Sequence, residues 1–140
     1  MANPSSFNQM IITEFRKNGG VLTGRDGKEN RTLLLLTTTG AKSGQPRTSP
    51  LAFTRDGERL LIIASNQGKP THPAWYHNLL ANPVVTIELG AEHFQARARD
   101  TTGEEHDRLY AQMAKELPGF AKYQSDTHRT IPLLVLERIS

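Results

Sequence analysis

The sequence predicts an α+β fold that is mainly β, an antiparallel barrel or sandwich with helices packed outside. Short apolar segments with strand character follow one another through tight turns that contain glycine. Few helical segments lie between them, so the strand–helix alternation of a doubly wound parallel sheet is missing. The length of 140 residues fits one domain, 1–140, whose first six residues we expect to be frayed.

Composition is that of an ordinary globular chain, with 36% hydrophobic and 22% charged residues. The net charge is only +3 and aromatic residues are 6%, which favours a small polyanionic ligand over nucleic acid. There is no cysteine, no secretory signal in residues 1–10 and no apolar run of about 20 residues. We therefore expect a cytoplasmic protein without an integral membrane segment, and peripheral contact with the inner face of a membrane stays open.

The first half of the chain predicts one helix followed by three strands. Apolar residues spaced along Phe7–Lys17 favour a helix, which the glycines of Asn18–Gly20 end. Four consecutive leucines do not alternate, but the threonines after them favour a strand. The Asp56–Gly57 pair predicts a hairpin turn. The expected strands are 31–39, 48–54 and 59–64, the last buried on both faces.

In the second half, Pro73 can begin a helix over Ala74–Ala81, with Trp75 and Leu79 facing inward. Alternating residues in 92–99 predict a strand whose arginines face solvent or a groove. Acidic residues suit the start of a helix that begins near Gly103. The remaining expected elements are strands 84–89 and 131–139 and helices 103–117 and 120–126.

The stretch Thr37–Pro50 is the first candidate ligand site. It joins two predicted strands and combines glycines and small hydroxyls with Lys42 and Arg47. Glycine allows sharp turns and close approach of a ligand, and successive N–H groups with two cations can bind an anion. A hairpin with a solvated tip would need similar residues, so the stretch alone leaves both readings open.

A second polar loop, Ser65–Pro73, has the same character and also follows a buried strand. Trp75 comes directly after it and can be either a core anchor or a wall beside an aromatic ligand. A planar ring with a phosphate tail would use the cations and the aromatic residue together.

Other chemistries find little support. His72 and His77 are five apart, not the four that places two ligands on one helix face, and we expect no metal site. Ser43, Ser49 and Ser65 lack a nucleophile-elbow motif, which argues against a hydrolase. Glu104 and Glu105 suit a helix start better than a pair of catalytic carboxylates.

Several motifs in order resemble the deazaflavin-dependent nitroreductases of actinobacteria. The first is Thr38–Pro50, which reads T-T-G-x-K-S-G-x-x-R-x-x-P. The others are Ala64–Ser65 with Gly68, Pro73–Leu79, Ala81–Pro83, Tyr123–Gln124 and Arg129–Pro132. Each motif is weak alone, but their order and spacing over roughly residues 8–138 are specific.

The resemblance implies a split β-barrel of the flavin-reductase/FMN-binding type and the cofactor coenzyme F420, a 5-deazaflavin with a phosphate and a polyglutamate tail. It implies an oxidoreductase that transfers a hydride from reduced F420 to a small organic acceptor. Family analogy assigns cofactor binding to Lys42, Ser43, Gly44, Arg47, Ser49, Pro50, Ala64, Ser65, Asn66, Gly68, Lys69, Trp75, Tyr76 and Asn78. Within this set, Lys42, Ser43 and Arg47 would hold the phosphate and tail. The ring would be bordered by Ala64, Ser65, Asn66, Gly68 and Lys69.

The chemistry would belong to the cofactor, so no covalent catalyst is expected. Ser65 and Tyr123 are candidates for polarising or protonating the acceptor, and Phe120 and Tyr123 for shaping its site. Family members often have a second basic residue where this chain has Ala41, which predicts weaker binding of the cofactor tail.

Members that act on bulky nitroimidazoles have a tyrosine where this chain has Phe120, which cannot donate a hydrogen bond. A quinone is therefore the favoured acceptor, with nitroaromatics as an alternative. A non-catalytic deazaflavin carrier and an FMN-dependent reductase of the same fold remain alternatives, as do a monomer and a homodimer.

Overall fold

A computed structural model describes residues 6–23, 29–30, 33–66, 70–125, 127 and 129–139. The helices are α1 (Ser6–Lys17), α2 (Ala74–Ala81), α3 (Gly103–Glu116) and α4 (Gly119–Ser125). The strands are β1 (Leu22–Thr23), β2 (Glu29–Asn30), β3 (Leu33–Thr39), β4 (Pro46–Ala52), β5 (Thr54–Asp56), β6 (Arg59–Ile63), β7 (Val84–Leu89), β8 (Glu92–Asp100) and β9 (Leu133–Arg138). Within these residues, no helix is long and apolar enough to cross a membrane.

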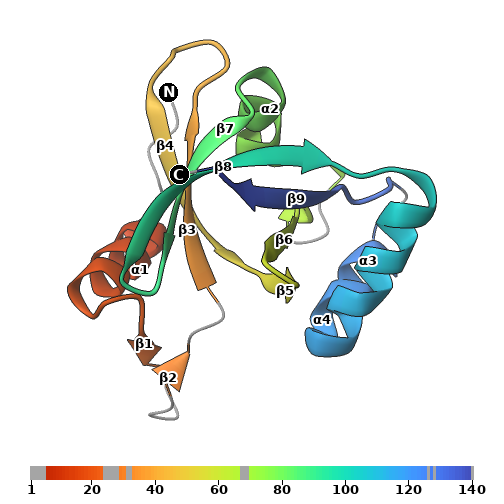
Figure 1. Ribbon diagram of the computed structural model, residues 1–140, viewed down its shortest axis with the longest axis horizontal. Helices are drawn as coiled ribbons and strands as arrows, with labels where there is room; N and C mark the ends of the chain where they lie inside the picture. Colours follow the sequence, from red (N-terminus) through yellow and green to blue (C-terminus); the bar gives the residue numbers. More distant parts are fainter. Residues whose placement is uncertain are drawn as a thin grey trace.

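Seven strands form one antiparallel sheet in the order β4-β3-β7-β8-β9-β6-β5, and β1 and β2 form a separate small ribbon. The two edge strands, β4 and β5, are consecutive in the chain and separated by Phe53 alone. A chain can pass from one edge to the other through one residue only if the sheet curls round on itself. The result is the curled half-barrel of Figure 1, which confirms the predicted barrel.

The apolar runs are strands with both faces buried. Leu34 and Leu36 join the cluster inside the curled sheet, whereas Leu35 packs with Ile12 and Phe15 of α1. In β6 and β9, alternate residues likewise divide between the interior cluster and a second cluster beneath α3. Because both faces are apolar, these strands show no alternation in the sequence.

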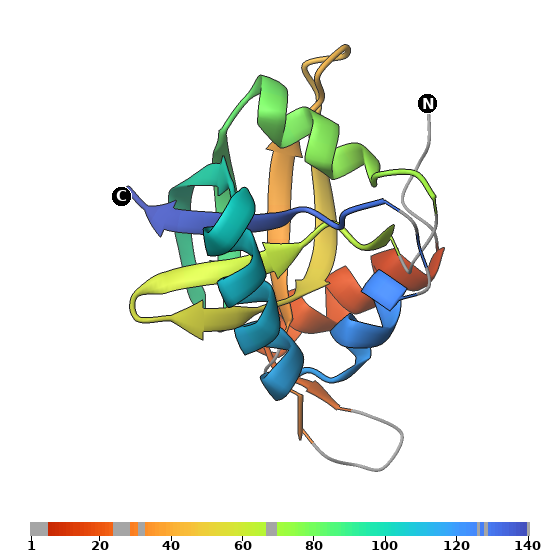
Figure 2. The same ribbon diagram turned by 90° about the vertical axis from the view of Figure 1, so that its right-hand side faces the viewer.

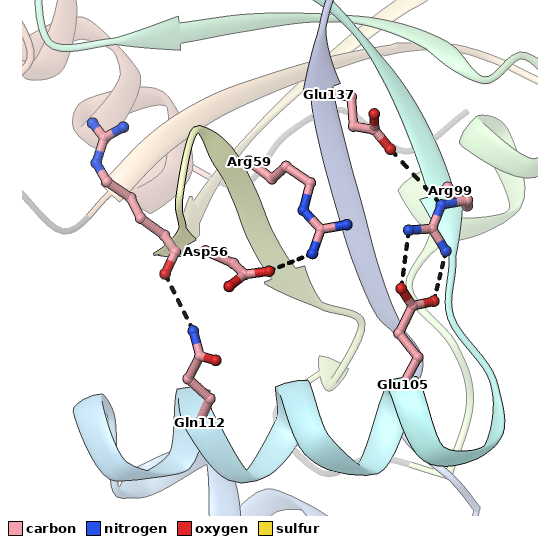
Figure 3. Close-up of polar contacts among 7 residues, drawn as sticks. Asp56, Arg59, Arg99, Glu105, Gln112 and Glu137 are labelled. Carbon is pink, nitrogen blue, oxygen red and sulfur yellow. Dashed lines mark hydrogen bonds and ion pairs between the residues drawn. The ribbon is translucent and has the colours of Figure 1, made fainter.

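Helix α3 covers part of the outer face of the sheet (Figure 2). Polar contacts lie along its margin (Figure 3). Glu105 accepts two hydrogen bonds from Arg99, at 2.6 and 3.1 Å, and Gln112 donates to the carbonyl of Arg55 at 3.4 Å. Arg99 also lies 3.9 Å from Glu137 of β9. These contacts orient α3 against β8 and β5.

Most predicted elements are confirmed, and the largest difference is at the corner of the sheet. The expected strand 48–54 is two strands, β4 and β5, which pair with different partners on either side of Phe53. As expected, Phe94, Ala96 and Ala98 of β8 are buried while the residues between them are exposed. The segment Gly24–Lys28, whose glycines and charged residues predict a turn in the sequence, lies outside the described residues.

Candidate functional site

The loop between β3 and β4 closes on itself. Gly40 N–H donates to the carbonyl of Gln45 at 2.8 Å, and Gly44 N–H donates to the carbonyl of Gly40 at 3.0 Å. Gln45 N–H donates to Ser43 Oγ at 3.2 Å. A Cβ at Gly40 would lie 2.5 Å from that Oγ, and Gly44 has a φ of +69°. Both glycines are therefore needed for this turn, which leaves Lys42 exposed at its tip.

Helix α2 is tied to this loop by Asn78. Its Oδ1 accepts from the N–H of Ala41 at 3.0 Å, and its Nδ2 donates to Thr38 Oγ1 at 3.3 Å. Trp75 and Leu79 of the same helix are buried in the interior cluster. The burial of α2 and the amide of Asn78 together set the position of the loop relative to the helix.

A cavity of about 760 Å³ lies between the loop and α2. Six of the residues predicted to bind a cofactor line it, namely Lys42, Ser43, Arg47, Ser49, Trp75 and Asn78. The remaining lining residues are Asn8, Gly40, Ala41, Thr48, Ala74 and His77. Among these described lining residues Lys42 and Arg47 carry the formal charges and none is a carboxylate, so the cavity suits an anion. Its volume is in the range of small-molecule sites, roughly 300–1,000 Å³.

Tyr76 lies away from this cavity. Residues 74, 75, 77 and 78 of α2 line the cavity, and Tyr76 falls on the other side of the helix. Its hydroxyl donates to Asp100 Oδ2 at 2.5 Å. Burial, together with this hydrogen bond, raises the pKa of Tyr76 to about 12. Tyr76 therefore stays protonated and supports α2 on the side away from the cavity. His77 does line the cavity, and sequence reasoning missed it although the helical period places it there.

The second loop contributes Ala64, Ser65 and Asn66, which do not line the cavity beside Lys42. Ala64 is buried, and Ser65 and Asn66 are half-buried. Asn66 has a φ of +48°, and its Nδ2 donates to the carbonyl of Thr71 at 3.0 Å. This hydrogen bond joins the two sides of the loop. Gly68 and Lys69 lie outside the described residues.

Pro50 and Tyr123 also do not line the cavity. Pro50 lies within β4, where it pairs with Leu35 of β3. Tyr123 of α4 is half-buried and packs against the cluster beneath α3. Phe120 belongs to α4, but its side chain lies outside the described residues. The cavity therefore collects the predicted anion-binding residues, while Ser65 and Tyr123 lie elsewhere.

A family model described as F420H(2)-dependent quinone reductase matches residues 9–138. The chain belongs to this family. An F420H(2)-dependent quinone reductase of Mycobacterium tuberculosis is 46% identical over 110 residues, which are 75% of this chain and 72% of the relative. This agrees with the resemblance found in the sequence motifs.

Two solved structures extend the comparison. A structure titled as an F420-H2 dependent reductase (FDR-A) matches with a TM-score of 0.71 and 38% identity, covering 76% of this chain and 95% of that one. Another, titled a domain-swapped dimer, has a TM-score of 0.73 and 32% identity, covering 92% of this chain and 95% of that one. The curled sheet of this family member is therefore a split β-barrel, as predicted.

Proposed function

We propose that this chain is an oxidoreductase that uses reduced coenzyme F420 to reduce a quinone. The observation that carries the proposal is the cavity between the β3–β4 loop and α2, where Lys42 and Arg47 lie close to Trp75. The residues present fit a cofactor that combines a phosphate, an anionic tail and a planar ring. Membership of the F420H(2)-dependent quinone reductase family supports the same cofactor and acceptor.

When bound, reduced F420 supplies a hydride to the acceptor. Lys42 and Arg47 would hold the phosphate and tail through charge-assisted hydrogen bonds. The side chain of Trp75 on α2 is buried and would offer a fixed apolar wall to a ring. The protein thus binds and orients the reacting partners and keeps water away from them. No side chain forms a covalent bond with either partner.

We place the acceptor outside the cationic cavity, toward the second loop. Ser65 lies there, whereas Tyr123 packs into the cluster beneath α3. Ser65 is therefore the better supported of the two predicted polarising residues. A quinone is the preferred acceptor because the family is described by it, and nitroaromatics are expected to react more slowly.

The proposal is tested by mixing purified protein with reduced F420 and menadione and following deazaflavin absorbance. We expect oxidation of the cofactor that depends on both the protein and the quinone. Tight binding of F420 without its oxidation would favour a carrier protein instead. Stronger binding of FMN than of F420, measured by fluorescence, would favour an FMN-dependent reductase.

Lys42→Ala tests the cofactor site directly. Loss of a charge-assisted hydrogen bond is expected to weaken F420 binding by about 1.5–3 kcal/mol, or roughly 10- to 150-fold. Because Lys42 is exposed, the melting temperature should not change. Lys115→Ala, which removes an exposed cation from α3, is the matched control and should leave binding intact. Unchanged F420 binding in Lys42→Ala would remove this assignment.

A further inference from the structure

Arg129 holds both ends of the second loop. Its Nη2 donates to the carbonyl oxygens of Ala64 at 3.1 Å and of Ser65 at 2.8 Å. Its Nη1 lies 2.9 Å from Nδ1 of His72 at the far end of the loop. Arginine can only donate, so Nδ1 of His72 is the acceptor and the imidazole carries its proton on Nε2. One guanidinium therefore connects residues 64, 65 and 72.

The position of Arg129 is itself set by Gln124 of α4. The side-chain Nε2 of Gln124 donates to the carbonyl of Arg129 at 2.8 Å, and its Oε1 accepts from the N–H of Ile131 at 2.9 Å. Ile131 is fully buried beneath α3. A short helix and a buried residue thus fix the main chain from the carbonyl of Arg129 to Ile131.

The two carbonyls reveal how the chain leaves β6. Successive carbonyls of an extended strand point in opposite directions, but those of Ala64 and Ser65 converge on one nitrogen atom. The backbone must therefore turn at Ser65, two residues after β6 ends at Ile63. In a trans peptide the N–H points opposite to the carbonyl, so the N–H groups of Ser65 and Asn66 point away from Arg129.

These two N–H groups are available to a ligand. Among the described residues, neither has a hydrogen-bond partner. Asn66 is held in the left-handed region by the contact of its side chain with Thr71. Adjacent N–H groups at a left-handed residue form a concavity that binds an oxygen carrying negative charge.

We propose that Arg129 is a positioning residue that orients the N–H groups of Ser65 and Asn66 as a pair of donors to a ring carbonyl oxygen. This inference rests on the proposed function, because both the deazaflavin and a quinone carry such carbonyls. Donors fixed in advance stabilise an oxygen that becomes more negative during hydride transfer. Ser65 and Asn66 then both contribute through their backbone N–H groups.

The experiment begins with the wild-type protein. Amide signals of Ser65 and Asn66 are followed by ¹H–¹⁵N NMR while F420 and menadione are added separately. We expect both signals to move downfield with one of the two, which identifies whether the cofactor or the acceptor supplies the carbonyl. Signals that do not move with either compound would overturn the proposal, whether or not the protein is active.

Arg129→Lys then tests the positioning role. A single ammonium cannot reproduce the planar set of contacts to two carbonyls and an imidazole. We expect the Kd of F420 or the KM of menadione, whichever NMR identifies, to rise about ten-fold, and kcat to fall. Arg16→Lys, which alters a two-point contact between α1 and Glu88 of strand β7, is the control and should change neither constant.

Arg129→Ala allows chemical rescue. Millimolar methylguanidine should restore part of the affected constant and return the amide signals of Ser65 and Asn66 toward their wild-type positions, whereas methylammonium should not. Arg129→Lys with wild-type constants would contradict the proposal. A wild-type protein that binds F420 with the expected amide shifts but reduces no quinone would contradict only the proposed function.

Discussion

The two loops beside α2 look alike in the sequence, yet they are held by different means. Each follows a buried strand and contains glycine and lysine. The first closes through hydrogen bonds among residues 40–45. The second depends on Arg129, whose contacts with Ala64 and Ser65 span 65 and 64 positions of the chain.

This difference suggests a division of labour. The first loop exposes Lys42 on a turn that keeps its shape through local bonds, which suits a flexible anionic tail. The second loop is connected to α4 through Arg129, which Gln124 holds. In addition, the N–H of Ala64 donates to the carbonyl of Pro132, directly before β9, at 2.9 Å. A rigid donor site needs such support from several elements, because small displacements weaken oriented hydrogen bonds.

The largest effect is expected at the contact that ties the first loop to α2. Asn78→Asp puts a carboxylate beside Lys42 and removes the donor to Thr38. F420 binding should weaken about 30-fold, by roughly 2 kcal/mol, because the new charge repels the phosphate and tail. Asn82→Asp adds the same charge at the end of α2 but outside the cavity, and isothermal titration should show little change for it. Equal losses in both variants would mean that net charge, not the cavity, controls binding.

Local patterns predicted most of the elements of the fold. The apolar runs in β3, β6 and β9, the Asp56–Gly57 turn and the bounds of α2 follow from residues close together in the chain. The corner at Phe53 does not, because residues 48–54 read as one strand and the change of partner depends on closure of the whole sheet. Element positions are therefore more predictable than the topology that joins them.

The site shows the same limit. Lys42, Ser43 and Arg47 were predicted because glycines and cations lie within one short stretch. Tyr76 was grouped with Trp75 and Asn78 by adjacency, but the helical period puts it behind α2, against Asp100. Arg129 appeared only as part of a motif, since nothing in the sequence indicates that a guanidinium near the C-terminus meets the carbonyls after β6.

The left-handed residues of the two loops offer a matched comparison of stability. Gly44→Ala introduces a Cβ that meets nothing within 4 Å, so its cost comes from a φ of +69° alone. Asn66→Ala at a φ of +48° also loses the hydrogen bond to Thr71. We expect losses in the free energy of unfolding of about 1 kcal/mol for Gly44→Ala and about 2 kcal/mol for Asn66→Ala.

Urea denaturation measures both changes, and Asn66→Gly separates their causes. Glycine keeps the backbone conformation and removes only the side-chain contact, so its loss should lie below that of Asn66→Ala. If Asn66→Gly and Asn66→Ala are equally destabilised, the left-handed conformation of residue 66 contributes nothing measurable to the free energy of unfolding. The two loops would then differ in backbone strain as well as in the hydrogen bonds that hold them.

The smallest effect is a pH dependence confined to the second loop. Burial lowers the pKa of His72 below 6.5, and the charge of Arg129 lowers it further, assisted by His77 and opposed by Asp100. The ring also lies 4.8 Å from that of Tyr76, which stays neutral. Because the unfolded chain takes up a proton on this residue first, the free energy of unfolding should fall as pH drops from about 6.5 toward the lowered pKa of the folded state.

His72→Gln removes this titration and keeps an acceptor for Arg129. Between pH 6.5 and 5, the free energy of unfolding of the variant should therefore depend less on pH than that of the wild type, while Lys42→Ala should follow the wild type. A charged His72 can no longer accept from Arg129, so the amide signals of Ser65 and Asn66 should shift over the same interval in the wild type alone. Parallel pH profiles for the wild type and His72→Gln would show that the contact with Arg129 survives protonation, and that the second loop is held chiefly through its carbonyls.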